Sequence, residues 1–284
     1  DFESGTNGSN IATGTGSATV GKWDAIGGGS GACLPKYDST FAHSGGKSYK
    51  TDYTIKTNTG TDANCSAYVY NLNTGDAFLS YWVYLPTSSI FPCYGGIGST
   101  DCNWKMAWLY GINTGYDDQV IPVGLPGGTT PPYSSWALSC NGCYGGTTNW
   151  FTLNMQKGKW YRIWAWIHGT TDTTGHKDTW VMSKDDNIPV TQKVNWNGQV
   201  FNTGGYFRNF AISAWARWCY NCTESAPRFD DVYLATGPNA RARIEIGNSA
   251  TYNTCTNLTI ATVTSWSDTS IQATVRQGSF GNFN

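Results

Sequence analysis

The stretch GKWYRIWAWIH, residues 158–168, decides the fold. In an extended strand successive side chains point to opposite faces, so this stretch divides into two sets with different chemistry. The set suited to a hydrophobic core is Tyr161, Ile163, Ala165 and Ile167. The other set is mostly aromatic or charged, and consists of Trp160, Arg162, Trp164, Trp166 and His168. Such rings are costly to leave near water without a purpose, so we expect the second face to contact something.

The same two-faced pattern occurs in three other segments, residues 77–85, 104–110 and 209–218. Their aromatic-rich faces carry Phe78, Ser80, Trp82 and Tyr84, then Trp104, Met106, Trp108 and Tyr110, then Ser213, Trp215 and Arg217. If these segments are neighbours in one sheet, their rings merge into a continuous platform.

The whole chain of 284 residues has the composition of an all-β protein. It is rich in Gly, Ser, Thr and Asn, and its apolar stretches alternate with period two. We therefore predict a two-sheet antiparallel β-sandwich, a jelly roll, over residues 1–236, and a small C-terminal β module, possibly incomplete, over residues 237–284. The expected strands are 66–72, 77–85, 104–112, 160–168, 179–183, 209–218 and 228–235. Residues 116–149, which are rich in Gly and Pro, are expected to form a long loop.

Charge and hydropathy exclude several classes of partner. The formal net charge is -1 and the basic residues are scattered, so we expect no nucleic-acid partner. No run of eighteen apolar residues occurs, so we expect no membrane insertion. The start of the chain lacks the features of a signal peptide, and we expect an already processed, extracellular or cell-surface protein, of a bacterial secreted kind. We expect no nucleotide, haem or flavin.

Nine cysteines are many for a cytosolic chain and predict disulfides formed in an oxidising compartment. The local pairs are Cys33 with Cys65, Cys93 with Cys102, Cys140 with Cys143, and Cys219 with Cys222. The last two pairs have C-x-x-C spacing and could instead hold a zinc ion together. Cys255 remains odd, and it or the C-terminal module could serve self-association.

Aromatic rings in a platform suit polysaccharide, because the C–H faces of a sugar ring stack on them while polar side chains satisfy hydroxyls. The expected contacts are Trp82, Tyr84, Trp108, Trp164, Trp166 and Trp215. The alternative is that these rings fill the core between two sheets.

Carboxylates near both ends of the predicted sandwich suggest a cation site. Glu3 lies near the start, and Asp230 and Asp231 lie in the last strand. First and last strands can meet, and oxygen ligands of this kind suit Ca²⁺.

Several short motifs resemble a known family. They are DFESG at residue 1, AHSGGKSY at 42, LSYWVYLP at 79, GKWYR at 158 and FDDVY at 229. They are similar to the concanavalin A-like jelly rolls of polysaccharide lyases and related carbohydrate-binding domains. The resemblance implies a calcium ion between the first and last strands and a sugar on the concave sheet. The tail resembles small β modules appended to secreted bacterial proteins.

Three functions remain open at this stage. A Glu-pair glycoside hydrolase is disfavoured, because the chain has only Glu3, Glu224 and Glu245 and none lies on an aromatic strand. A lyase acting on uronate glycans by β-elimination needs a base, an acid and a cation, and the candidates are His168, Tyr84 or Tyr110, and Arg162 or Arg217. Polysaccharide binding without chemistry is the favoured hypothesis. A structural subunit of an extracellular fibre is the third.

Overall fold

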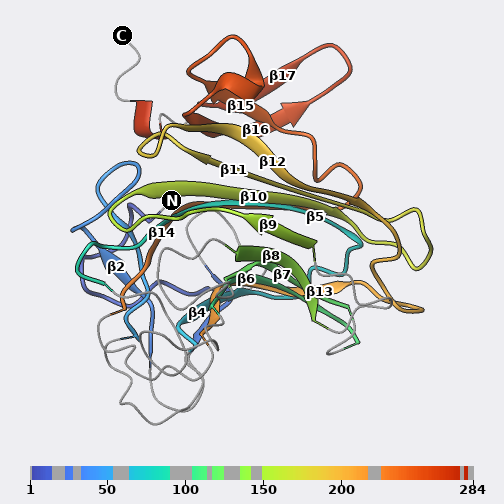
Figure 1. Cartoon of the computed structure of the whole chain (residues 1–284), viewed down its shortest axis with the longest axis horizontal. Helices are drawn as coiled ribbons and strands as arrows, with labels where there is room; N and C mark the ends of the chain where they lie inside the picture. Colours follow the sequence, from blue (N-terminus) through green and yellow to red (C-terminus); the bar gives the residue numbers. More distant parts are fainter. Residues whose placement is uncertain are drawn as a thin grey trace.

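The computed structural model describes residues 2–14, 23–27, 33–53, 64–89, 104–113, 117–124, 135–141, 149–216, 225–275 and 278–280, with 122–124, 135–141 and 214–216 described by backbone alone. In this part of the chain the strands form two seven-stranded sheets and one three-stranded sheet. One seven-stranded sheet, called sheet A, is the middle layer (Figure 1). The other seven-stranded sheet, called sheet B, packs on one face of sheet A, and the three-stranded sheet, called the third sheet, packs on the opposite face. The prediction of an all-β jelly-roll sandwich with a small C-terminal β appendage is confirmed.

Sheet A contains, in spatial order, β12 (Ile188–Asn197), β11 (His176–Ser183), β10 (Trp160–His168), β5 (Asp76–Tyr84), β14 (Arg228–Thr236), β3 (Ser48–Lys50) and β2 (Lys36–Asp38). Sheet B contains β1 (Ala25–Gly27), β4 (Ser66–Val69), β13 (Phe207–Ala216), β6 (Trp104–Gly111), β7 (Asp118–Gly124), β8 (Ser135–Asn141) and β9 (Asn149–Thr152). The third sheet contains β15 (Ile244–Gly247), β16 (Leu258–Trp266) and β17 (Ile271–Thr274). Two short 3-10 helices, Tyr252–Thr254 and Gly278–Phe280, flank it.

The core between sheets A and B contains the side chains expected there. Tyr161, Ile163, Ala165 and Ile167 are all buried in it. The β5 residues that pair with them, Leu79 opposite Ala165 and Tyr81 opposite Ile163, share this face. The alternation in the sequence therefore predicts correctly which side chains point inward.

β5 is buried on both faces, from Ala77 to Tyr84, because a second apolar cluster forms on the outer face of sheet A. This cluster joins side chains of sheet A to side chains of residues 240–258. Its buried members are Phe78, Trp82, Trp164, Met182, Val190, Ala240, Cys255 and Leu258. The third sheet is thus packed on the sandwich by a shared hydrophobic interface.

The prediction of a long loop over residues 116–149 is wrong, because β7 and β8 lie within this range. Pro122 and the surrounding glycines concealed these strands. The β7–β8 register shifts between Val120 and Val123, on either side of Pro122. Proline is tolerated in sheets at such irregularities.

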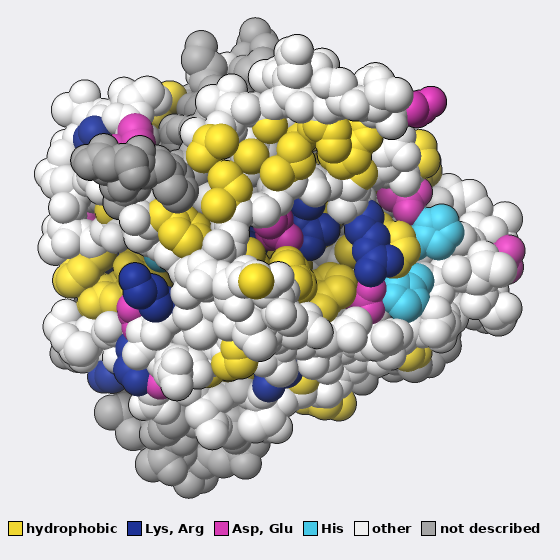
Figure 2. Space-filling model, turned by 90° about the horizontal axis from the view of Figure 1, so that it is seen from above, with side chains coloured by type: hydrophobic (Ala, Val, Ile, Leu, Met, Phe, Trp, Pro, Cys, Tyr) yellow, Lys and Arg dark blue, Asp and Glu magenta, His cyan; other side chains and the backbone are white. Residues whose placement is uncertain are grey.

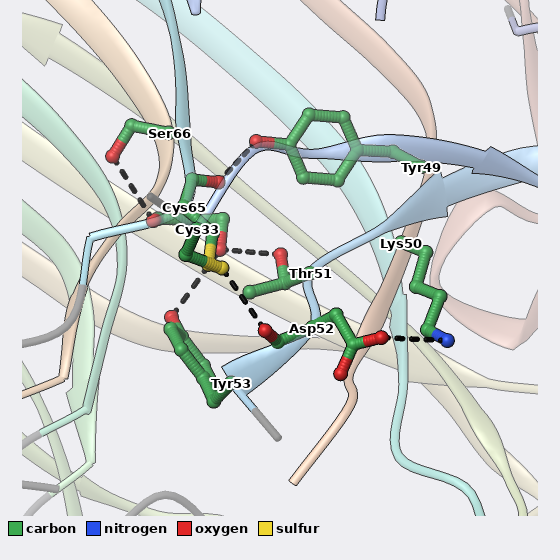
Figure 3. The surroundings of a disulfide bond; sticks show 9 residues. Cys33, Tyr49, Lys50, Thr51, Asp52, Tyr53, Cys65 and Ser66 are labelled. Atoms are coloured by element: carbon green, nitrogen blue, oxygen red, sulfur yellow. Dashed lines mark hydrogen bonds and ion pairs between the residues drawn. A yellow bond between two sulfur atoms is a disulfide. The ribbon is translucent and has the colours of Figure 1, made fainter. Parts of the chain in front are cut away.

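The Cys33–Cys65 disulfide is present and buried, as predicted (Figure 3). It lies beside a network of buried hydroxyl groups. The Tyr49 hydroxyl donates to the Cys65 carbonyl, and the Thr51 and Ser213 hydroxyls are 2.6 Å apart. The cross-link therefore ties the residue before β4 of sheet B to the segment that leads into β2 of sheet A. The other three predicted pairs involve Cys93, Cys102, Cys140, Cys143, Cys219 and Cys222, whose side chains lie outside the described residues, and so does the zinc alternative.

Among the described residues, no helix is long and apolar enough to cross a membrane.

Candidate functional site

The expected single aromatic platform is wrong, because its four segments lie in two different sheets. β5 and β10 are paired in sheet A, whereas β6 and β13 are paired in sheet B. The outer rings of β5 and β10 and those of Trp108 and Tyr110 on β6 point away from the common core, and therefore in opposite directions. Trp104 and Met106, which were expected on the same face as Trp108, lie in the core instead. The platform becomes two separate surfaces.

The outer face of sheet A is covered. Trp164 is 0% and Trp82 is 2% exposed, under the shared cluster. The His43 ring also stacks on Trp82, with centroids 3.6 Å apart. Tyr84, at 9% exposed, packs against Phe41. The expectation that Trp82, Tyr84 and Trp164 lie on an open surface is therefore not met. The third sheet, whose docking the sequence does not reveal, occupies most of this face.

Arg162 is buried in an ion-pair network with the third sheet. Its Nη2 donates to Oε1 of Glu245, and Nη2 of Arg243 is 2.9 Å from the other carboxylate oxygen. Burial acts to raise the pKa of Glu245, but the two guanidinium groups outweigh it and hold that pKa below its usual value. The charge of Arg162 is thus paired with a carboxylate of the same chain. Because the guanidinium group is not at an open surface, it is not placed to contact a substrate as the catalytic prediction requires.

His168 lies at the end of β10, on the same outer face of sheet A. Its Nδ1 is 2.6 Å from Oδ1 of Asp76, and its side chain is 40% exposed. Trp166, half-buried, stacks beside it at 6.2 Å. Tyr110, by contrast, is on sheet B. Since the two outer faces point in opposite directions, His168 and Tyr110 do not form one catalytic site, which corrects the expectation that they act together.

The outer face of sheet B carries two stacked ring pairs. Tyr68 and Tyr70 are 5.7 Å apart by ring centroid, and Trp108 and Tyr110 are 4.8 Å apart and nearly parallel. Ala211 on β13 is paired with Tyr68 on one side and Trp108 on the other. Side chains at paired positions share a face, so the small side chain of Ala211 separates the two ring pairs across three neighbouring strands.

This face is opposite to the core. The adjacent row, Val69, Phe210 and Leu109, is buried between the sheets. Tyr70 is 36% exposed, and Tyr68, Trp108 and Tyr110 are half-buried. Of the rings predicted to contact sugar, Trp108 therefore lies on a surface that the third sheet does not cover.

Lys105 joins this face through a break in alternation. Its Nζ lies 4.2 Å from the centroid of the Trp108 ring, although the two residues are three positions apart. Trp104 and Ala107, also three apart, are both in the core. The β6–β13 register shifts at the same level, between Ile212 and Trp215, where Ser213 adopts a positive φ of 54°. β-Bulges re-aim side chains in this way and are frequent beside functional sites. Strict period-two reasoning assigned Lys105 to the core side and missed it.

The phenol of Tyr110 lies in surroundings that favour its protonated form. Burial raises the pKa of its phenol well above the ordinary value, and the neighbouring Tyr68, Asp118 and Tyr70 raise it further. Asp118 is fixed on β7, where its Oδ1 accepts a hydrogen bond from the Gly111 amide at 2.7 Å. Tyr110 therefore keeps its proton at neutral pH.

The three predicted calcium ligands lie around one loop, residues 43–47. The Glu3 carboxylate accepts hydrogen bonds from the Gly46 and Lys47 amides. Asp230 accepts from the His43 and Ser44 amides. Burial, together with Asp231, raises the pKa of Asp230.

These carboxylates thus face N–H donors, and in the described part of the chain no three His, Cys, Asp or Glu side chains are grouped as metal ligands. Calcium binding by Glu3, Asp230 and Asp231 stays a prediction.

Three remaining predicted residues are placed only in part. Trp215 is on β13 opposite Lys105, but only its backbone is described. Arg217 lies outside the described residues. Cys255 has a free thiol, as expected, but it is 1% exposed, so a disulfide to another chain requires the interface around it to open.

Comparison with known proteins supports the architecture. The structure superimposes on the marine alginate lyase from Aplysia kurodai with a TM-score of 0.50, at 10% identity, covering 80% of this chain and 98% of that one. The chain has the jelly-roll fold of polysaccharide lyases. It is also similar to an endo-β-1,4-glucuronan lyase from Trichoderma reesei, at 13% identity and a TM-score of 0.48, covering 82% and 96%. A third similar structure is a β-glucanase catalytic domain from Podospora anserina, at 12% identity and a TM-score of 0.47, covering 81% and 97%.

No protein-family profile matches the sequence, and no curated protein matches it either. At these identities the structural likeness establishes the fold alone. The resemblance that the short motifs predicted is confirmed at that level. The disulfide is consistent with a secreted protein.

Proposed function

We propose that this chain is an extracellular protein that binds polysaccharide on the outer face of sheet B. The observation that carries the proposal is the pair of ring stacks, Tyr68 with Tyr70 and Trp108 with Tyr110, on either side of Ala211. Rings of this kind present apolar faces to the C–H bonds of sugars while the phenol groups bond to hydroxyls. Lys105, which is buried, places its ammonium group against the Trp108 ring of the same face.

The fold supports the proposal by analogy only. The similar structures act on alginate, glucuronan and β-glucan by their names, and a jelly roll hosts many functions. These three polymers form the natural panel for a binding test, because they differ in charge while sharing a long chain of sugar rings.

The test is affinity electrophoresis of the whole chain through gels that contain each polymer. We expect retention by at least one, and Tyr70→Ala and Trp108→Ala should each weaken it about tenfold, the cost of losing one stacked ring and its burial. Trp266→Ala is the matched control, because Trp266 is 51% exposed on the third sheet. If all three variants are retained equally, the outer face of sheet B does not bind the polymer.

A lyase is the second candidate, and the placement of Lys105 and Tyr110 on one face favours it. In β-elimination a base takes the proton next to the uronate carboxylate, the electron pair left behind forms a carbon–carbon double bond, and the bond to the glycosidic oxygen breaks. His168 is on the opposite face, so the proton would pass to a water molecule at the outer face of sheet B. Tyr110 would give its proton to the leaving oxygen, and Lys105 would neutralise the carboxylate. Absorbance of unsaturated product on uronate polymers tests this. Tyr110→Phe should abolish the product while retention in the gel persists.

A further inference from the structure

The junction between sheet A and the third sheet contains three N–H groups with no acceptor among the described residues. They are Nη1 of Arg162, Nε1 of Trp164 and Nε of Arg243, and all three atoms are buried. Arg162 and Trp164 are themselves 1% and 0% exposed. A buried donor without a partner costs free energy, and nearly all such groups in folded proteins are satisfied by protein, water or an ion.

The three donors are close neighbours. Arg162 and Arg243 bind the two oxygens of the same Glu245 carboxylate. The guanidinium carbon of Arg162 is 4.6 Å from the centroid of the Trp164 ring. That of Arg243 lies 4.1 Å over Phe78, which is on β5 beside the same cluster. The three side chains that carry these donors therefore meet at one junction, around Glu245 and the Trp164 and Phe78 rings.

The donors define the chemistry of the missing partner. Arginine and tryptophan side chains donate hydrogen bonds and accept none, so their partner must be an acceptor. In the part of the chain that the structure describes, Arg162, Arg241 and Arg243 are paired with two carboxylates, those of Glu245 and Asp178, and Asp178 is also bonded to His176. Positive charge is therefore in excess. Arginine is well suited to carboxylates and other oxyanions.

Arg241 of the same junction reaches the surface, although the three donor atoms are buried. Arg241 is 55% exposed, lies 4.5 Å over the Trp166 ring and is 3.8 Å from Asp178. Viewed from the side of the third sheet, the surface is hollowed where basic, acidic and hydrophobic side chains meet, with histidine beside them (Figure 2). His168 and His176 flank Trp166 at this end of β10 and β11.

We propose that this junction binds one oxyanion, such as a carboxylate, between the sandwich and the third sheet, with Arg162, Trp164 and Arg243 as the donors. The site is on the opposite side of the sandwich from the proposed polysaccharide face and does not depend on it. Because the anion would bridge the two parts, binding would stabilise the docked third sheet.

Calorimetric titration of the full chain tests the proposal, with acetate, glucuronate and sulfate as probes at an ionic strength held constant with sodium chloride. We expect saturable binding of one equivalent of at least one probe. Tighter binding of glucuronate than of acetate would assign the site to an acidic sugar, whereas equal binding or a preference for sulfate would assign it to a free anion. Trp164→Phe keeps the ring system largely in place but removes its N–H, and should weaken binding about tenfold.

Trp180→Phe is the matched control. Trp180 stacks on Trp164 at 6.1 Å, and its indole N–H is not among the unpartnered groups. Arg162→Lys is a second variant that keeps the charge facing Glu245 and removes Nη1, and it should also weaken binding. No saturable binding of any probe to the wild-type chain would overturn the proposal, and so would equal losses in Trp164→Phe and Trp180→Phe.

Discussion

The outer faces of sheets A and B arise from the same sequence pattern and have different surroundings. On sheet A, Trp82 and Trp164 alternate with core residues and are buried in the cluster that joins sheet A to residues 240–258. On sheet B, Trp108 and Tyr110 alternate in the same way, and the third sheet does not reach them. A period-two aromatic pattern therefore shows that a face is not the core, but it does not show what that face contacts.

Charge distinguishes the two faces. On sheet A, Arg162 forms a buried ion pair with Glu245 of the same chain. Sheet B places Lys105 over an aromatic ring at the edge of a partly exposed surface. The first arrangement holds two parts of the protein together, whereas the second suits recognition of a separate molecule.

The largest expected effect separates the two faces by stability. Trp164→Ala removes a wholly buried ring and should lower the free energy of unfolding by about 3–5 kcal/mol. Trp108→Ala, at a half-buried position, should lower it by about 1 kcal/mol. Urea unfolding of both variants measures the difference. Equal losses would mean that the two faces are buried alike.

The next effect concerns the cross-link that anchors sheet B. Removing the disulfide with Cys33→Ala and Cys65→Ala opens a 32-residue loop and should lower the unfolding free energy by about 3.5 kcal/mol. Thermal unfolding of the double variant, compared with the wild-type chain under oxidising and reducing conditions, measures it. A wild-type chain that melts at the same temperature in both conditions would show that the cross-link does not contribute.

The interface on sheet A should depend on pH. Glu245→Gln leaves two buried guanidinium groups without a counter-charge and should lower the unfolding free energy by about 3 kcal/mol at neutral pH. Because the folded pKa of Glu245 is lowered, its contribution is full above the unfolded pKa of about 4.3 and is lost as pH falls through the folded pKa. Unfolding measured from pH 7 down to pH 3 should therefore show a shallower acid loss in the variant. If the wild-type chain and the variant lose unfolding free energy in parallel as the pH falls, Glu245 is not the source of the acid dependence.

The smallest effect is on sheet B. Tyr70→Ala should change the unfolding free energy by only about 0.5 kcal/mol, since Tyr70 is 36% exposed. Its effect should instead appear as weaker retention by polysaccharide, by about 1 kcal/mol. A variant that unfolds much more easily would place this ring in a structural contact instead.

Much of the fold is readable from the sequence, and the site only in part. β10 spans the residues predicted for it, because its alternation is uninterrupted. β7 and β8 are hidden by Pro122 and by glycines, whose local preferences oppose a strand although tertiary pairing sustains one. Sheet membership depends on long-range pairing, so nothing local reveals that β5 and β6 belong to different sheets.

The bulge beside Ser213 shows a second limit. The extra residue lies on β13, at the level where Lys105 contacts the Trp108 ring, and a positive φ at a non-glycine residue marks it. No simple pattern in the sequence predicts such a position. The packing of the third sheet on sheet A cannot be predicted from the sequence for a similar reason. Ala240 and Leu258 are ordinary apolar residues, and nothing in the sequence around them indicates which surface they contact.

Hydroxyl-radical footprinting of the whole chain, with and without the polysaccharide that retains it, tests the central claim most directly. The account predicts that Tyr70 and Trp108 are labelled in the free protein and protected in the complex, while Trp82 and Trp164 remain unlabelled in both. Labelling of Trp82 and Trp164 that the polysaccharide suppresses, with Tyr70 and Trp108 unchanged, would contradict it.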